Sequence, residues 1–515
     1  MSAMDLELAP VPGFTAVRRR RLAADAWLGE IAQARAAGAR LCALWAWDAR
    51  AAEGAYRVCA VVQQQRSLDW LELALPAEGP LDYPDLSGLF PAAGRMQRAA
   101  YDLLGVRAAA ADQRPWLRHA WPGGLFPLRT DAPANTAGEV SESPAGPYPF
   151  VTVAGDGVHE IPVGPVHAGI IEPGHFRFSV VGEKVLRLEE RLGYVHKGIE
   201  KRFESFPAAE GQRLAARVSG DSAVGFSWAY CMALEALCGA QPPARALHLR
   251  ALALERERLA NHLGDLGALG NDAGFAFGLS QFGHVKECLL RSNADLYGRR
   301  YPMDEVVPGG VAHDLTAAQI ARVLEELDTL NGQLAELEAI YADHPGLQDR
   351  FAGAGRVIPQ LAARLGLTGL AGRASGQAFD LRADCPAPPY DRLEVRTVVR
   401  DEGDVAARVA VRFEEARLAI GLCRRLLREL PAGAIRSPLP APRSDQPGLG
   451  LIEGWRGPLL VALEVGGDGR IAHCRPQDPS WHNWPVLEHA IIDNIVPDFP
   501  LINKSFNLSY SGHDL

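Results

Sequence analysis

Paired cysteines are missing from this chain of 515 residues. It has eight cysteines, and no two of them stand in a Cys-x-x-Cys spacing. Thiolate pairs of that kind hold soft metal centres, and a His-Glu-x-x-His spacing is absent as well. Scattered single cysteines are typical of a reducing compartment rather than of a disulfide framework. The sequence therefore predicts neither a thiolate-bound metal nor a disulfide scaffold.

Long apolar runs and strongly basic stretches are also scarce. No run approaches the roughly 20 apolar residues that a membrane-spanning helix needs, so membrane association would have to come through partner subunits. The basic run at 18–21 is short, and we interpret it as a solvated start. The formal net charge of −9 argues against a nucleic-acid partner, because phosphates are bound by basic patches.

Glycine-rich nucleotide-binding motifs are a further absence. The chain contains neither Gly-x-Gly-x-x-Gly nor a P-loop. Those motifs let backbone N–H groups approach a dinucleotide or a triphosphate. We therefore expect that this chain does not itself hold NAD or ATP.

The composition is that of an ordinary globular protein, with 48% apolar and 22% charged residues, and the length suffices for two or three domains. Helical and extended patterns alternate near the N-terminus, at 27–40, 40–47, 56–63 and 95–106. Residues 131–149 are rich in Pro, Ala, Ser and Gly without periodicity, which is typical of a linker. We predict an α+β domain over 1–130, a linker over 131–149 and a second domain over 150–515.

The second domain is predicted to be mainly α-helical, with β-hairpins near both of its ends. Helical periodicity occurs at 207–239, 243–269, 279–300, 316–341 and 404–430. For the first of these, a helix that is broken near 219–225 is the alternative. Alternating apolar positions at Phe176, Phe178 and Val180 precede a Gly182 turn, which predicts one hairpin. A second hairpin is predicted from strands at 458–465 and 470–474.

Several motifs identify a family. Residues 164–176 read GPVHAGIIEPGHF, 193–201 read GYVHKGIEK, and 257–272 read ERLANHLGDLGALGND. They resemble the large subunits of group 4 membrane-bound [NiFe] hydrogenases of the formate-hydrogenlyase and hydrogenase-4 type. They also resemble the related D (quinone-site) subunit of NADH-quinone oxidoreductase, complex I. YDLLG at 101–105 and PLRTD at 127–131 resemble the C subunit, which is fused in front in the formate-hydrogenlyase type.

The resemblance implies four thiolates in two Cys-x-x-Cys pairs. Ser219 and Ser222 stand at the first pair, and Ser509 and Gly512 stand at the second. A serine hydroxyl is barely ionised at neutral pH and cannot replace a thiolate on nickel or iron. We therefore expect no nickel–iron centre in this chain and no H2 chemistry.

Two further positions carry roles in the family. A Glu before Pro-Gly-His-Phe relays protons there, and Glu172 matches it, with an ordinary strand carboxylate as the alternative. An Arg lies over the metal in hydrogenases, and Arg456 matches it although Trp455 replaces the family's Pro. The Asp partner of that Arg is Asn507 here, so we expect a weakened pair, and a structural role for Arg456 stays open.

Quinone contacts are the third implied feature. In complex I the loop supplies a His at the position occupied here by Ile171. Complex I also uses a Tyr near the first Cys-x-x-Cys position, where Gly220 stands here. His167, His175 and Tyr510 are the candidate acceptor contacts that remain, and backbone hydrogen bonding is the alternative for the two histidines. We expect the cavity to lie where the 164–175 loop, the 219–222 turn, Arg456 and residues 507–512 converge.

The resemblance implies a peripheral subunit of a membrane-bound respiratory-type oxidoreductase. It would shape a quinone- or acceptor-type cavity beside an iron-sulfur small subunit similar to the complex I B subunit. Antiporter-like membrane subunits would hold it on the cytoplasmic face of the bacterial inner membrane, and NAD(H) would react only through partner subunits. The alternative is a non-redox structural or coupling scaffold of an ion-transporting membrane complex.

Overall fold

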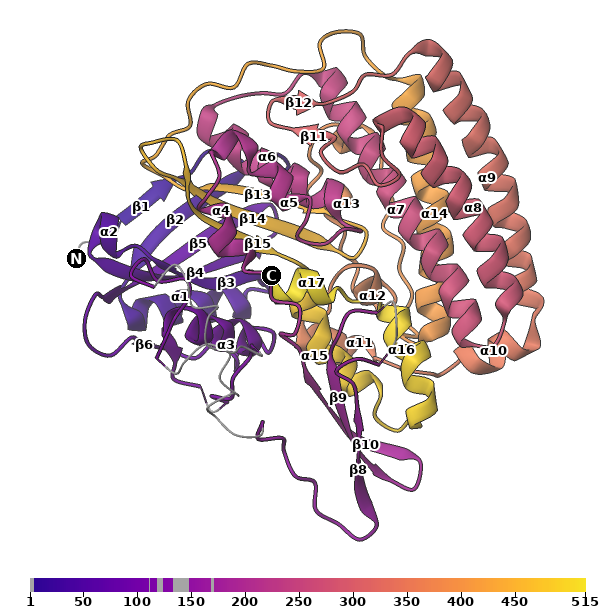
Figure 1. The fold of residues 1–515 in the computed structure, drawn as a ribbon, viewed down its shortest axis with the longest axis horizontal. Helices are drawn as coiled ribbons and strands as arrows, with labels where there is room; N and C mark the ends of the chain where they lie inside the picture. Colours follow the sequence, from indigo (N-terminus) through magenta and orange to yellow (C-terminus); the bar gives the residue numbers. More distant parts are fainter. Residues whose placement is uncertain (1–3, 111, 118–123, 133–147, 168–170) are drawn as a thin grey trace.

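The computed structural model describes residues 4–110, 112–117, 124–132, 148–167 and 171–515. Most of the linker predicted at 131–149 lies outside these ranges. A five-stranded mixed sheet forms the N-terminal part, and its strands follow the order β1-β2-β5-β4-β3 (Figure 1). The strands span Met4–Glu7 (β1), Ala16–Leu22 (β2), Arg40–Asp48 (β3), Ala55–Gln64 (β4) and Ser67–Pro76 (β5). The predicted strands at 40–47 and 56–63 are confirmed as β3 and β4.

The basic run at 18–21 is a strand and not a solvated start. It forms most of β2, which pairs in parallel with β5. Arg19 and Arg21 both donate to the fully buried Glu72 of β5, and Arg18 pairs with Asp69 on the same strand. The interpretation was wrong because a cross-strand carboxylate neutralises charges that look solvated in sequence.

Short helices and strands complete this N-terminal part. They are α1 (Ala24–Ala36), α2 (Arg50–Glu53), β6 (Asp82–Tyr83), α3 (Ala93–Leu104) and β7 (Arg107–Ala108). The predicted helix at 27–40 is therefore α1, which begins and ends earlier. The predicted helix at 95–106 is confirmed as α3.

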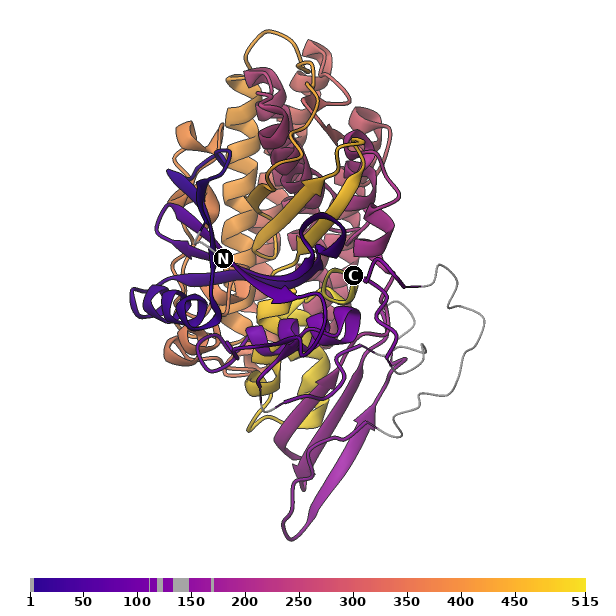
Figure 2. The same ribbon diagram turned by 90° about the vertical axis from the view of Figure 1, so that its left-hand side faces the viewer.

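A three-stranded antiparallel sheet projects from the body of the molecule (Figure 2). It consists of β8 (Val158–Val163), β9 (His175–Val181) and β10 (Lys184–Arg191). The predicted hairpin is confirmed, because β9 and β10 are joined at Gly182, which has a positive φ of 60°. Phe176, Phe178 and Val180 are fully buried, as the alternation predicts.

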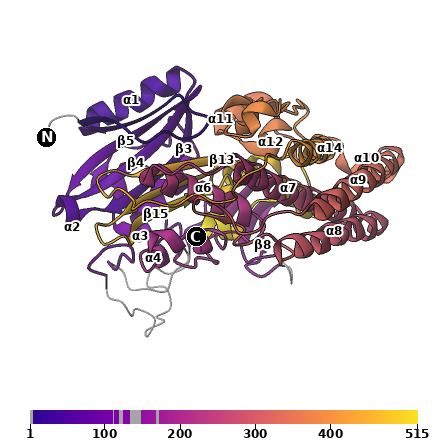
Figure 3. The ribbon, with the colours of Figure 1, turned by 90° about the horizontal axis from the view of Figure 1, so that it is seen from above.

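Long helices make up the opposite end of the molecule from the N-terminal sheet (Figures 1 and 3). They are α7 (Ala244–Asp272), α8 (Ala276–Tyr297), α9 (Ala317–Asp343) and α14 (Val405–Arg428), whereas α6 (Ala223–Cys238) lies closer to the N-terminal sheet. The predicted helix at 207–239 is not one unit, and its main interruption lies close to the alternative break near 219–225. It consists of a 3-10 turn at Ala208–Glu210, α5 (Gln212–Ala215) and α6, with a turn at 216–222 between the last two.

The remaining elements are short. They are α4 (Ile199–Phe203), β11 (Val306–Val307), β12 (Gly310–Val311), α10 (Pro345–Phe351), α11 (Pro359–Leu365), α12 (Gly369–Arg373) and α13 (Leu381–Asp384). After α14 follow β13 (Gly448–Glu453), β14 (Pro458–Val465), β15 (Ile471–Gln477), α15 (Ser480–Ala490), α16 (Phe499–Phe506) and α17 (Tyr510–Asp514). Strands β13, β14 and β15 form an antiparallel sheet, which confirms the predicted second hairpin.

One buried apolar cluster runs from Leu8 to Leu515 and joins both ends of the chain. Polar contacts also join the N-terminal sheet to the β13–β15 sheet. Arg57 of β4 donates to Glu464 of β14 at 2.7 and 2.5 Å. Helix α7 is buried on nearly all sides, so it packs at the centre of this cluster. Among the described residues, no helix is long and apolar enough to cross a membrane.

Candidate functional site

The candidate site is built from three segments that are far apart in sequence. They are the 216–222 turn before α6, the loop between β13 and β14, and the segment that enters α17. The Ser219 and Ser509 hydroxyl oxygens lie 2.8 Å apart and share a hydrogen bond. Ser509 also caps α17, since its Oγ accepts from the Gly512 N–H at 2.9 Å. The fold thus joins Ser219, Ser509 and Gly512 by direct hydrogen bonds.

Arg456 lies at the centre of these segments and is only 6% exposed. Its Nη1 and Nη2 donate to the two carboxylate oxygens of Asp221 at 2.7 and 2.5 Å. Its Nε donates to the backbone oxygen of Asn507 at 2.5 Å, and Nη1 lies 3.4 Å from the Ser222 hydroxyl. The Asn507 side chain is not a partner of Arg456, and Asp221 supplies the carboxylate that Asn507 lacks.

Asp221 is a site residue that the sequence analysis missed. Burial alone would raise the pKa of its carboxyl, but the Arg456 guanidinium outweighs burial and holds that pKa below its usual value. The Asp221 side chain is still 35% exposed in the isolated chain, and neighbouring Gly220 is exposed. The site therefore reaches the protein surface at this turn. Its position between two predicted site residues, Ser219 and Ser222, is the signal that could have found it.

Asp478 is a second residue that the sequence analysis missed. Its side chain is fully buried, and its Oδ1 accepts from the Ser480 N–H at 2.8 Å. Its Oδ2 has no hydrogen-bond partner among the described residues. Burial raises the pKa of Asp478, although Arg456 opposes that shift. Nothing in the sequence around 478 distinguishes it from an ordinary helix-start carboxylate.

The residues at the four implied ligand positions do not fit a nickel–iron centre. Soft thiolates are required there, whereas the Ser219 and Ser509 hydroxyls are already bonded to each other. A Cβ at Gly512 would lie 2.5 Å from Oδ2 of Asp478, so a longer side chain does not fit either. Within the described ranges, no group of three or more His, Cys, Asp or Glu side chains is arranged to hold a metal ion.

The site has two flanks: the first holds Arg456 and the 216–222 turn, and the second holds Glu172 and His167. Oε2 of Glu172 accepts from the Ser511 N–H at 3.0 Å. The Tyr510 hydroxyl lies 3.4 Å from Nε2 of His167, and burial raises the pKa of that hydroxyl. Nδ1 of His167 lies 3.2 Å from a backbone oxygen, that of Pro165. The structure therefore brings Glu172, His167 and Tyr510 to the start of α17.

His175 is not brought to this flank. It precedes Phe176 on β9, and successive side chains of a strand point to opposite faces. Its Nδ1 lies 3.4 Å from the backbone oxygen of Gly164, and its ring packs against Phe150 at 5.3 Å between centroids. Burial lowers the pKa of His175. The backbone-bonded alternative therefore describes His175.

Lys197 links the two flanks. Its Nζ donates to the backbone oxygen of Val218 at 2.8 Å, directly before Ser219. Burial lowers the pKa of Lys197, and the charge of Glu172 partly restores it. A basic group thus lies between Glu172 and the 216–222 turn.

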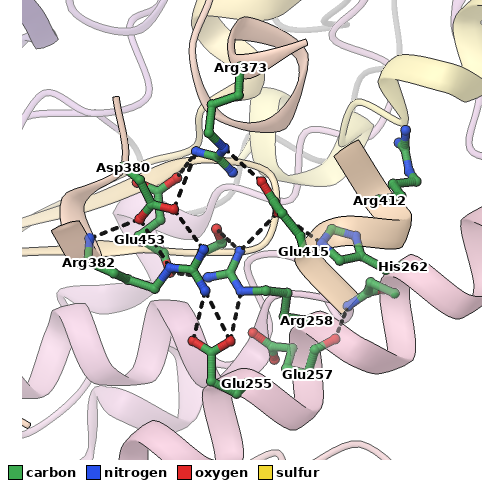
Figure 4. A network of polar contacts seen from close by, with 12 residues as sticks. Glu255, Glu257, Arg258, His262, Arg373, Asp380, Arg382, Arg412, Glu415 and Glu453 are labelled. Carbon is green, nitrogen blue, oxygen red and sulfur yellow. Dashed lines mark hydrogen bonds and ion pairs between the residues drawn. The ribbon is translucent and has the colours of Figure 1, made fainter. Parts of the chain in front are cut away.

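A buried network of charges fixes the loop that carries Arg456 (Figure 4). Arg258 of α7 donates to the backbone oxygens of Glu453 at 2.9 Å and Gly454 at 3.1 Å. Arg373 pairs with Glu453 at 2.8 Å and with Glu415 at 2.7 Å. Because these groups are buried on several different elements, the loop is held from both sides.

The same network contains two carboxyl groups whose pKa values are shifted in opposite directions. Burial, reinforced by Asp380, raises the pKa of Glu453 to about 7. Burial also acts on Glu415, but Arg373 and His262 hold the pKa of Glu415 well below its usual value. Both carboxyls are paired with Arg373, so their opposite pKa shifts arise within one buried ion-pair network.

Glu257 connects this network to the site. Its carboxylate accepts from the N–H groups of Val224 at 2.7 Å and Gly225 at 3.2 Å, in the first turn of α6. Burial raises the pKa of Glu257 to about 8 in spite of these two hydrogen bonds. This carboxyl therefore titrates close to neutral pH, and it is bonded to the helix that begins directly after Ser222.

Comparisons with known proteins match both parts of the chain to subunits of complex I and of related hydrogenases. Residues 22–137 match the family model of the respiratory-chain NADH dehydrogenase 30 Kd subunit, and residues 272–448 match that of the 49 Kd subunit. Formate hydrogenlyase subunit 5 of Escherichia coli is 30% identical over 93% of this chain and 85% of its own length. The fused C/D subunit of NADH-quinone oxidoreductase from Bacteroides fragilis is 28% identical over 75% of this chain and 76% of its own.

Two further relatives are informative. The carbon monoxide-induced hydrogenase of Rhodospirillum rubrum is 32% identical over 68% of this chain and 97% of its own length. A chain of the membrane-bound sulfane sulfur reductase, an archaeal respiratory membrane complex, superposes with a TM-score of 0.66. The match covers 70% of this chain and 98% of that chain at 24% identity, which shows a shared fold.

Proposed function

From its membership of the family of formate hydrogenlyase and hydrogenase large subunits and fused C/D subunits of NADH-quinone oxidoreductase, we propose a role for this chain. The chain is a peripheral subunit of a membrane-bound oxidoreductase complex. In this proposal the chain shapes a cavity in which a quinone or a similar acceptor is reduced. Electrons come from an iron-sulfur cluster in a partner small subunit, and the chain holds no nickel–iron centre of its own. Antiporter-like membrane subunits hold the complex on the cytoplasmic face of the bacterial inner membrane.

The observation that carries the proposal is Arg456, a nearly buried cation with carboxylates around it. A fixed cation stabilises negative charge that develops on an acceptor when electrons arrive. The exposed turn at Gly220 and Asp221 is the proposed contact for the iron-sulfur subunit, because it brings the cluster next to Arg456.

Protons for the acceptor would come from the second flank. Reduction of a quinone to a quinol takes two electrons and two protons. Glu172 is the proposed relay, with His167 and the Tyr510 hydroxyl as contacts for the acceptor oxygens. The exposed apolar side chains Val166 and Ile171, which are 78% and 43% exposed, suit the apolar body of such an acceptor.

A non-redox scaffold is the second candidate. The hydrogen bond between Ser219 and Ser509 and the pair between Arg456 and Asp221 favour it, because satisfied polar groups stabilise a packed interior without chemistry. In this case the chain would be kept for its shape within an ion-transporting membrane complex.

The subunit composition of the native complex separates these candidates. The complex is purified from gently solubilised membranes through a tag on this chain, and its subunits are identified by mass spectrometry. An iron-sulfur subunit together with an NADH- or formate-oxidising module supports the redox subunit. Antiporter-like subunits without a cluster protein support the scaffold.

Substitutions then test the site itself. We expect Glu172→Gln and Arg456→Ala to lower acceptor reduction about tenfold or more in a complex of unchanged composition, as removal of a positioned charge does in other active sites. Glu160→Gln serves as the control, since Glu160 is an exposed carboxylate on β8. Activity that is unchanged in both site variants would contradict the redox proposal.

A further inference from the structure

A separate cavity of about 230 Å³ lies between the N-terminal sheet and the helical part of the chain. Its walls come from the end of α1, from the edge strand β3, from the segment that follows α11, and from β13 and β14. Figure 3 shows α11 beside that edge of the sheet. A single buried water needs only roughly 10–15 Å³ on a comparable scale. The cavity is therefore large enough for an organic molecule, and none of the site residues described above lines it.

Three arginines, Arg35, Arg40 and Arg364, line this cavity, and no Asp or Glu does so. Within the described part of the chain, none of their guanidinium groups makes a hydrogen bond or an ion pair. Arg40 instead lies over the ring of Phe379, with 3.9 Å from its Cζ to the ring centroid, and Arg35 lies over Phe90 at 5.3 Å. Asp384 and Glu453 attract Arg40 only through space, and burial lowers its pKa.

The rest of the wall is mainly apolar. It includes Leu41, Leu365, Leu367, Leu451, Pro458 and Leu460. Arg40 is the enclosed member of the three, whereas Arg35 is half-buried and Arg364 is exposed at the mouth. An enclosed cation without a hydrogen-bonded partner is costly, because its desolvation is not offset. An arginine fork binds carboxylates and phosphates with two parallel hydrogen bonds. Cations, apolar walls and aromatic rings together therefore favour a ligand that is anionic at one end and apolar at the other.

We propose that this cavity binds an organic anion, a carboxylate or a phosphate monoester carried on an aromatic or apolar body. The anionic group is held by Arg40, with Arg35 and Arg364 beside it. The apolar body packs between the leucines of the wall and the rings of Phe90 and Phe379.

Isothermal titration calorimetry on the full-length chain tests the proposal. The probes are 1-naphthoate, 1-naphthyl phosphate and the neutral analogue 1-naphthalenemethanol, which differ in charge but share one body. We expect saturable binding of at least one anion. The neutral alcohol should bind about tenfold more weakly or worse, because a hydrogen bond to a charged group contributes an effect of that size. Naphthoate binding without phosphate binding, or the reverse, identifies the anionic group that the cavity accepts.

Three variants assign the binding to this cavity. Arg40→Met keeps the apolar stem and removes the charge, and we expect it to weaken anion binding about tenfold or more. Ala363→Trp fills the cavity from an exposed position, so it tests the same site without disturbing the interior. Arg291→Met on α8, whose side chain is 78% exposed, is the control and should bind as the unchanged chain does.

Three results would overturn the proposal. They are no saturable binding of either anion, equal binding of the neutral alcohol, and binding that survives Ala363→Trp. Thermal unfolding followed by circular dichroism establishes that each variant is folded. If Arg40→Met does not fold, the Ala363→Trp result decides the outcome.

Discussion

At the scale of single residues, the pair between Arg456 and Asp221 determines the electrostatics of the candidate site. Arg456 is nearly buried, whereas 35% of the Asp221 side chain is exposed to solvent. Exposed ion pairs contribute little to stability, but removing one partner of a buried charge leaves the other uncompensated. The pair lies between these two cases, and its geometry is bidentate, which strengthens it.

Asp221→Asn tests that pair. We expect a loss of about 1–3 kcal/mol in the free energy of unfolding, because Arg456 loses a charged hydrogen-bond acceptor. Urea unfolding followed by circular dichroism measures the loss. Asp445→Asn is the matched control: it removes an exposed pair with Arg443, so it should change the free energy of unfolding much less than Asp221→Asn does. Equal effects of the two substitutions would contradict the account of Arg456.

Glu257→Gln tests a pH dependence. The pKa of Glu257 is about 8 in the folded chain against an ordinary 4.5, so the folded state holds a proton that the unfolded state releases. Its contribution to stability is complete below pH 4.5 and is lost as the pH rises through about 8. We therefore expect the variant to lose less stability than the unchanged chain between about pH 5 and 9, because glutamine does not titrate. Urea midpoints across this range give the two slopes, and parallel slopes would refute the assignment.

At the scale of elements, capping and buried charges decide where helices and loops begin. Thr316 caps α9: its Oγ1 accepts from the Gln319 N–H, while the Gln319 side chain accepts from the Thr316 N–H. Such reciprocal caps satisfy two N–H groups that have no partner inside the helix. The loop between β13 and β14 depends instead on Arg258, which holds its backbone from α7.

Thr316→Ala should lower the free energy of unfolding by about 1 kcal/mol, because the hydroxyl no longer accepts from the Gln319 N–H or donates to the Gln319 side-chain oxygen. Thr329→Ala is the control on the same helix, since its exposed hydroxyl only bonds back to the Glu325 oxygen. Denaturant midpoints of the two variants give the comparison. A control that is as destabilised as Thr316→Ala would show that the cap is not the cause.

Local pattern predicted the long helices well, because α7, α8, α9 and α14 each repeat an apolar face over many residues. At 207–239 the alternative with a break near 219–225 is closer to the structure, because the polar segment at 216–222 is a turn between α5 and α6. Local pattern failed at β2, whose arginines are neutralised by carboxylates of β5. That error depends on contacts with a distant segment, which periodicity does not contain.

At the scale of the whole molecule, the same limit applies to the candidate site. Motif positions predicted Ser219, Ser509, Gly512 and Arg456, and the fold brings them together. Asp478 could not be predicted, because it enters the site only through the connection from β15 to α15. Gly512 is 34 residues further along the chain, and only the fold brings it against the Asp478 carboxyl, where a Cβ added to the glycine would collide.

The two predicted domains should stay together after the chain is cut between them. We expect that a protease site inserted within 133–147 yields fragments that co-elute in size-exclusion chromatography. The reason is the single apolar cluster from Leu8 to Leu515, which both fragments share. Arg57→Met should weaken this association, since Arg57 bonds Glu464 across the boundary. Fragments that elute separately at micromolar concentration would contradict the expectation.

The partial exposure of Asp221 makes the ion pair sensitive to permittivity. In the free chain, water reaches the carboxylate at the 219–222 turn and screens its attraction to Arg456. A protein surface that covers this turn excludes that water, and Coulomb energies grow as the effective dielectric constant falls. A partner surface at this turn would therefore strengthen the attraction between Arg456 and Asp221, so the electrostatic potential at the centre of the site depends on whether the turn is covered.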